Sequence, residues 1–252
     1  MMILKLAGRE LRLLFRSPLP WILLAVSQAV TAWWFLSLVE QFQAVYQPML
    51  VRTNSPMGVT DLVLMPFFGS VVVLGMLLLA AALLAMRLIA DERRSGAIVM
   101  LFAAPLTITE LVLGKYLAAL GFLMVLMATW CVMPAALLIG TELDLGRLAA
   151  AALALTLLAL AFASVALFAS TLTLQPGVAV VLTAGIVLAL LGLDAAVDSD
   201  DPLTRYVALL PHYESLVQGR VASEDIVYFV LLTVGFLGFT IQRLDGLRLR
   251  AG

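Results

Sequence analysis

Six long apolar segments limit most strongly what this chain can fold into. Each is mostly uncharged, and together they cover residues 19–39, 61–90, 114–139, 147–172, 177–197 and 226–241. A helix needs about 20 mostly apolar residues to cross the roughly 30 Å hydrocarbon core of a bilayer, whereas membrane β-barrels alternate apolar and polar residues in shorter stretches. The segments therefore predict an all-α integral membrane protein with six transmembrane helices.

The composition agrees with this fold class. Of the 252 residues, 63% are hydrophobic and 12% are charged, against about 25% charged in an average soluble domain. A soluble fold of this size cannot cover so much apolar surface, and a net charge of −1 provides no basic field for nucleic acid. These values exclude a soluble enzyme, a disordered chain and a nucleic-acid-binding protein. They predict a single membrane domain over residues 1–252.

Residues 2–17 carry an amphipathic pattern. Basic side chains recur at spacings of four, three and four, which places them on one face of a helix: Lys5, Arg9, Arg12 and Arg16. Leucine and alanine occupy another face, and Ser17 and Pro18 end the segment. The pattern is typical of a helix that lies in the membrane interface with its basic side toward anionic head groups. The alternative is an ordinary basic flank of the first span.

The distribution of charge predicts the orientation in the membrane. Most of the 15 basic residues fall near the two termini or between the second and third spans, namely Lys5, Arg9, Arg12, Arg16, Arg87, Arg93, Arg94, Lys115, Arg243, Arg248 and Arg250. The acidic residues are mostly on the other side. Cytoplasmic segments carry the excess of Lys and Arg, so both termini and the 91–113 segment are expected in the cytoplasm.

A few residues within the spans are candidates for packing or for a transport path. Ala159, Ala163 and Ala166 form a small-residue stripe on the fourth span, and such stripes permit close helix packing in lipid. Asp194 near the end of the fifth span could mark a path, or could be an ordinary helix end beside the acidic run at 198–201. An ion-coupled carrier normally has more ionisable groups in its spans, so energy is expected to come from another subunit.

Catalytic and metal-binding motifs are absent from the sequence. A P-loop requires Gly, four residues and then Gly-Lys-Ser/Thr, but Gly114-Lys115 has Thr109 and Tyr116 in the other required positions. No His-Glu-x-x-His or Gly-x-Ser-x-Gly motif occurs. The single histidine, His212, is interpreted as a surface or interfacial residue. We therefore expect no catalytic residue, no bound metal and no cofactor on this chain.

The 91–113 segment differs from the spans around it in its alternation of charged, apolar and helix-breaking residues. A charged cluster at 91–94 is followed by a reversal at Ser95-Gly96, a short apolar helix at 97–103 and a break at Pro105. Such a segment is suited to present a short helix to a cytoplasmic partner and to transmit a push into the second and third spans. The alternative is a solvated loop between spans.

Several stretches resemble one family of membrane proteins. Residues 87–106, RLIADERRSGAIVMLFAAPL, followed by ELVLGKY at 110–116, are similar to a run found in ABC-2-type exporter permeases, the membrane subunits of ATP-binding-cassette transporters. The beginning of the chain (REL at 9–11, FRSP at 15–18) and its end (YES at 213–215, GRV at 219–221, DIVYF at 225–229) resemble the same family. The gliding-motility permease subgroup is the most similar.

The sequence departs from the family pattern in two places and lacks one signature. Asp91 stands where the family usually has Glu, and Met100 replaces another Glu. The V-x-G-x-V-P-Y signature of sugar-exporting members is missing, so polysaccharide export is not expected.

The resemblance implies a fold, partners and site residues. It implies the ABC-2 (type V exporter) permease fold in a bacterial inner membrane, with an N-terminal elbow helix at 2–17, a cytoplasmic coupling segment at 91–113 and an outer re-entrant loop at 198–225. The residues implied to contact the ATPase are Asp91, Glu92, Arg93, Arg94, Ser95, Gly96, Pro105 and Leu106, with Glu92 and Arg93 as anchors.

The implied partners are two ATPase subunits, which bind ATP and Mg, and a second copy of the chain or a homologous permease. The lipid bilayer surrounds the assembly, and the outer loops are compatible with a periplasmic partner. The alternative function is a membrane assembly or anchoring subunit without a transport cycle of its own, which would use the small-residue fourth span as a docking face.

Overall fold

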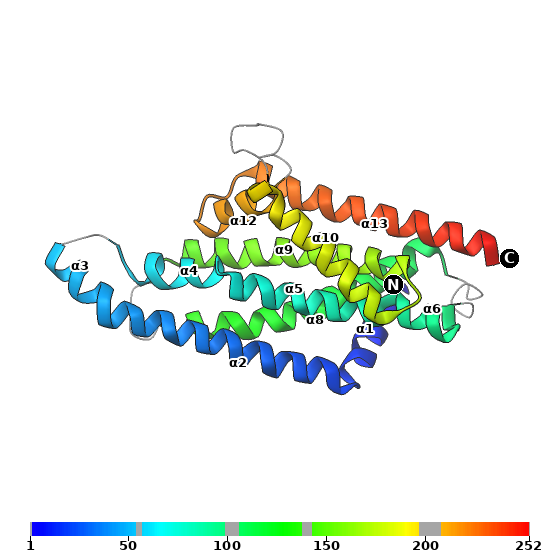
Figure 1. Cartoon of the computed structure of the whole chain (residues 1–252), viewed down its shortest axis with the longest axis horizontal. Coiled ribbons are helices and arrows are strands. Elements are labelled where there is room, and N and C mark those ends of the chain that lie inside the picture. The colour runs from blue at the N-terminus through cyan, green and yellow to red at the C-terminus, as the bar shows by residue number, and fades with distance from the viewer. Residues whose placement is uncertain (1, 54–56, 99–105, 138–142, 197–207, 252) are drawn as a thin grey trace.

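The computed structural model describes residues 2–53, 57–98, 106–137, 143–196 and 208–251, and all regular secondary structure in these ranges is helical. Figure 1 shows long helices running side by side in one elongated bundle. The elements in chain order are α1 (Met2–Phe15), α2 (Pro18–Gln41), η1 (Phe42–Tyr46), α3 (Gln47–Thr53), η2 (Thr60–Leu64), α4 (Met65–Phe68), α5 (Val71–Ala85), η3 (Met86–Ala90), α6 (Asp91–Ser95), α8 (Ile108–Ala136), α9 (Leu145–Leu172), α10 (Pro176–Ala196), α12 (Leu209–Val217) and α13 (Ser223–Ala251).

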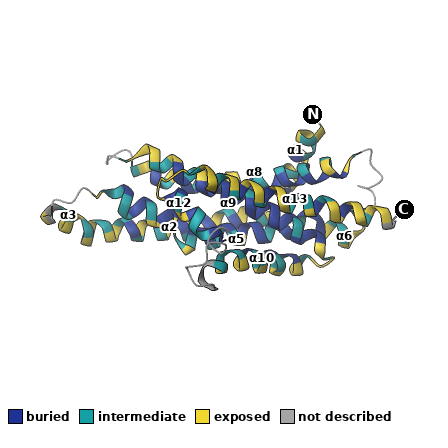
Figure 2. Cartoon of the chain, turned by 90° about the horizontal axis from the view of Figure 1, so that it is seen from above, coloured by how far each residue is buried: buried dark blue, intermediate teal, exposed yellow. Residues whose placement is uncertain are grey.

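Six helical stretches are long and apolar enough to cross a membrane, which confirms the six predicted spans. They are Pro18–Leu50, Thr60–Ser95, Ile108–Ala136, Leu145–Leu172, Pro176–Leu193 and Ser223–Leu249. Helix α1 precedes them and points away from the bundle axis in Figure 2. It buries Ala7 and Leu14 and leaves the four basic side chains of the predicted amphipathic face exposed.

The first span is longer than predicted. The sequence predicts a loop from residue 40 to residue 60, but the helix continues through the π-helical turn η1 into α3 and reaches Thr53. Polar residues such as Gln41 and Gln43 are good helix formers, so polarity alone does not end the helix. The wider turn comes directly before Pro48, which cannot donate a helical hydrogen bond.

The last span is also longer than predicted. The sequence predicts a span at 226–241 followed by a basic tail, but α13 continues to Ala251. No proline interrupts this stretch, and Leu244 is fully buried, one turn beyond the half-buried Ile241. An apolar face with helical spacing therefore extends the helix beyond the uncharged stretch.

Helix α9 lies at the centre of the bundle. It contacts α5, α8, α10 and α13, and Figure 2 shows that buried residues follow the inside of the bundle. The alanines of its small-residue stripe are buried, with Ala159 and Ala166 fully enclosed and Ala163 exposed by 1%. Small side chains allow neighbouring helices to approach this central helix closely.

Candidate functional site

The second span ends in a short polar helix, α6, which is the described beginning of the predicted coupling segment. After α5 the chain forms the π-helical turn η3 and then α6. Gly96 ends α6 with a φ of 77°, a left-handed conformation that glycine adopts without a side-chain penalty. Residues 99–105, which include Pro105 and most of the predicted 97–103 helix, lie outside the described residues.

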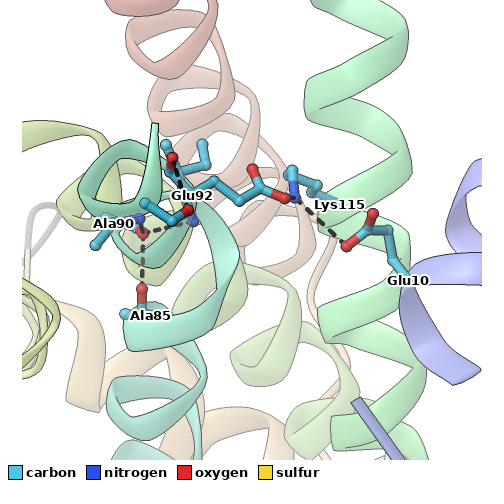
Figure 3. A network of polar contacts seen from close by, with 8 residues as sticks. Glu10, Ala85, Ala90, Glu92 and Lys115 are labelled. Atoms are coloured by element: carbon cyan, nitrogen blue, oxygen red, sulfur yellow. Dashed lines mark hydrogen bonds and ion pairs between the residues drawn. The ribbon is translucent and has the colours of Figure 1, made fainter. Parts of the chain in front are cut away.

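Lys115 of α8 connects α6 to α1. Its side chain is only 1% exposed, and its Nζ lies 2.5 Å from Oε1 of Glu92 and 3.4 Å from Oε2 of Glu10 (Figure 3). A buried ammonium group requires such partners because removal from water strongly disfavours an isolated charge. One cation therefore holds carboxylates from two segments that are far apart in the sequence.

Ser170 of α9 fixes the turn that leads into α6. Its hydroxyl donates a hydrogen bond to the carbonyl oxygen of Ala85 at 2.6 Å and accepts bonds from the backbone N–H groups of Ile89 and Ala90, both at 2.9 Å. Figure 3 shows Ala85 and Ala90 on either side of this turn. All these groups are buried, and a π-helical turn shifts the usual helical pairing. The hydroxyl thus satisfies three backbone groups at once.

Arg93 of α6 reaches the end of α9. Its guanidinium donates to the carbonyl oxygens of Thr171 and, at 3.5 Å, of Thr173. The last carbonyl groups of a helix have no helical partner and carry the negative end of the helix dipole. A cation at this position satisfies them, so α6 is connected to α9 as well as to α8 and α1.

The remaining polar residues of α6 face outward. Asp91, Arg94, Ser95 and Gly96 are exposed, while Glu92 and Arg93 are half-buried. Leu106 is half-buried just before α8, which begins with a capping box between Thr107 and Glu110. The predicted coupling residues at 91–96 thus divide into a pair that contacts the bundle and an exposed set.

Close helix contact positions α1 against α8. A Cβ atom at Gly114 would lie 2.5 Å from Cδ2 of Leu6, whereas at Gly121 it would lie 3.4 Å from Cδ2 of Leu11. The first distance leaves no room for a side chain, so Gly114 lets α1 approach α8 one residue before Lys115. This approach brings Glu10 within reach of the ammonium group.

Polar contacts at the opposite end of the bundle correct one prediction. His212 does not lie open on the surface, since its side chain is 11% exposed and its Nδ1 lies 2.6 Å from Oδ1 of Asp225; its interfacial position stays a prediction. Its ring stacks on Tyr228 at a centroid distance of 4.4 Å. These partners come from α13, so the fold alone brings them together.

The neighbouring α12 is held by a buried tyrosine. The Tyr213 hydroxyl donates to the carbonyl oxygen of Phe68 at 2.7 Å. Burial raises the pKa of Tyr213, which keeps this donor protonated. Asp194 lies near the end of α10, and its side chain is outside the described part of the structure.

Comparison with known proteins assigns the family. Residues 5–244 match the model of the ABC-2 family transporter proteins. The chain belongs to the ABC-2 transporter family. It is a multi-pass membrane component of such a transporter and a non-catalytic subunit. No curated protein sequence gives a significant match.

The ABC-2 permease has no metal centre among its described residues, where no three His, Cys, Asp or Glu side chains group together. The groups that organise its polar network were not predicted as a site. Lys115 appears in the sequence as part of a failed P-loop match, and Glu10 as part of an amphipathic helix. A lysine in an otherwise apolar span is the signal that could have indicated the network, because such a charge needs a buried partner.

Proposed function

We propose that this ABC-2 permease forms the transmembrane path of an exporter as a dimer and is driven by separate ATP-binding-cassette ATPase subunits. ABC-2 permeases imply such ATPase partners, and the sequence has no P-loop of its own. The proposal places the chain in a bacterial inner membrane with both termini and α6 in the cytoplasm, in accord with the clustering of Lys and Arg at that end.

The connections of α6 are the observation that carries the mechanism. Glu92 pairs with Lys115 of α8, and Arg93 donates to the end of α9. A partner that displaces α6 therefore pulls directly on two spans, and Glu10 extends the effect to α1, the proposed elbow helix. ATP-driven closure of the ATPases would move this unit and shift the spans between two arrangements.

The division of α6 into two faces refines the role of each coupling residue. We assign the exposed Asp91, Arg94 and Ser95 to direct contact with the ATPase, together with the rest of the segment up to Leu106. Glu92 and Arg93, which are held by the bundle, serve as the anchors that transmit the movement. A charge change on the exposed face of α6 should therefore weaken binding of the ATPase. A charge change at Glu92 or Arg93 should instead impair the transmission of ATPase movement to the spans.

Co-purification tests this assignment. The full-length tagged chain, solubilised in a mild detergent from its native membrane, should carry a protein with a Walker A motif that mass spectrometry identifies. The double charge reversal Asp91→Arg with Arg94→Glu should reduce its recovery by about tenfold, as expected for the loss of two interfacial charge contacts. The matched control is Glu214→Arg with Arg220→Glu, an exposed pair at the other end of the bundle.

Two results would contradict the proposal. Unchanged ATPase recovery with the α6 reversal would remove the assignment of Asp91 and Arg94. An ATPase that co-purifies but hydrolyses ATP at the same rate with and without the permease would favour the anchoring alternative.

A further inference from the structure

A pocket of mixed polarity lies between α9 and α13, separate from the network around Lys115. It has a volume of about 380 Å³ and is lined by Phe168, Leu172, Phe239, Gln242 and Arg243. One part of its wall is aromatic and aliphatic, and the other carries a guanidinium and an amide. A ligand that fits both parts must itself be amphipathic.

The apolar wall is formed by an aromatic cluster. The ring of Phe168 lies 5.6 Å from that of Phe236 and 6.0 Å from that of Phe239, measured between centroids. Phe239 is 56% exposed and Leu172 is 38% exposed. The wall thus offers open apolar surface on a membrane-spanning part of the bundle, where an acyl chain can lie against it.

The polar wall carries an uncompensated positive charge. Within the described part of the chain, Arg243 has no ion-pair partner. Arg93 of α6 places a second positive charge at the same end of α9. Leu172 of the pocket lies between Thr171 and Thr173, whose carbonyl oxygens accept from Arg93.

We propose that this pocket binds an anionic phospholipid, with an acyl chain along Phe168, Leu172 and Phe239 and the phosphate at Arg243 and Gln242. The phosphate supplies the negative charge that the pair Arg243 and Arg93 lacks. Basic pockets between spans at the cytoplasmic side are typical sites for anionic lipid head groups.

Native mass spectrometry of the full-length chain in detergent tests the binding. Phosphatidylglycerol should form a saturable adduct, and phosphatidylcholine should bind several times more weakly. The variant Arg243→Gln should weaken phosphatidylglycerol binding about fivefold, which is the expected effect of one basic residue near an anionic head group. The matched control is Arg248→Gln, because Arg248 is exposed on the same helix but does not line the pocket.

A second pair of variants tests the apolar wall. Phe239→Ala should weaken the phosphatidylglycerol adduct, whereas Leu231→Ala, at an exposed position of α13 outside the pocket, should leave it unchanged. Equal binding of both lipids, or equal loss with Arg243→Gln and Arg248→Gln, would overturn the proposal. The proposal would also be overturned if Phe239→Ala dissociated a dimer of the chain but left lipid binding unchanged, because the pocket would then be a contact between two copies. The measurement needs no ATPase, so its failure and that of the proposed function are distinguishable.

Discussion

At the scale of single residues, two buried polar side chains organise the end of the bundle. Lys115 balances two carboxylates from different helices, and Ser170 satisfies three backbone groups at the turn before α6. Both lie in helices that are mostly apolar. Together they fix the end of the second span against α1, α8 and α9.

Replacing Lys115 should disturb both stability and transmission. Lys115→Met leaves Glu10 and Glu92 facing each other without a cation, and we expect a loss of about 1–3 kcal/mol in the free energy of unfolding. Adding Glu92→Gln should recover part of the loss, because the remaining carboxylate then has no charged neighbour to repel it. Thermal unfolding in detergent measures both variants. If the double variant is as unstable as the sum of the single ones, the two groups are not coupled.

Replacing Ser170 should be more costly than replacing a neighbouring buried serine. Ser170→Ala removes the hydroxyl that bonds two amides and one carbonyl of the turn, at an expected cost of about 1–3 kcal/mol. Ser164 is equally buried, but its hydroxyl donates only to the carbonyl oxygen of Ala161 in its own helix, at 2.7 Å. Ser164→Ala should therefore cost about 0.5 kcal/mol or less. If urea unfolding gave similar losses of unfolding free energy for Ser170→Ala and Ser164→Ala, the role assigned to Ser170 would be contradicted.

At the scale of elements, the approach of α1 to α8 depends on a glycine. A Cβ atom at Gly114 would collide with Leu6, whereas a Cβ atom at Gly121 would fit beside Leu11. The contact joins the amphipathic N-terminal helix to the span that carries Lys115. Any displacement of α1 should therefore also disturb the Glu10 pairing.

The variants Gly114→Ala and Gly121→Ala form a matched pair that tests this contact. Gly114→Ala should destabilise the protein by about 1–3 kcal/mol through overpacking, despite the better helix propensity of alanine. Gly121→Ala should be neutral or stabilising, since its Cβ meets only ordinary van der Waals distances. The melting temperature and the protease sensitivity of α1 provide the measurements. Equal effects would mean that α1 moves freely on α8.

The sequence predicted which segments form membrane-spanning helices better than it predicted where those helices end. Apolar runs predicted the six spans. The first and last helices nevertheless continue to Thr53 and Ala251, because residues such as Gln43 and Leu244 favour helix even where the mean hydropathy falls. The sequence also placed a charged cluster at 91–94. It could not show that Glu92 and Arg93 turn inward, since their partners Lys115 and Thr171 are distant in the chain. The surface position predicted for His212 was wrong because Asp225 and the stacked ring of Tyr228 cover it only in the folded bundle.

At the scale of the whole molecule, the polar contacts of the bundle gather at its two ends. One end holds α6, Lys115 and the end of α9, and the other holds the pair His212–Asp225 and the pair Arg147–Asp61. The centre between them, built around α9, is closely packed and mostly apolar, and such packed interiors transmit strain. A push on α6 is therefore expected to travel along whole spans rather than through local side-chain changes.

Movement of α6 upon ATP binding is the most direct test of this account. Spin labels at Arg87→Cys, in the turn η3 directly before α6 and outside the residues assigned to the ATPase contact, and at Arg220→Cys, in a Cys131→Ser background, report the distance between this turn and the opposite end of the chain in the complex with its ATPase. We predict that ATP with vanadate shifts the distance distribution in the otherwise native chain, and that Lys115→Met reduces the shift while the ATPase stays bound. An unchanged distribution in the native complex would contradict the claim that α6 transmits ATPase closure to the spans.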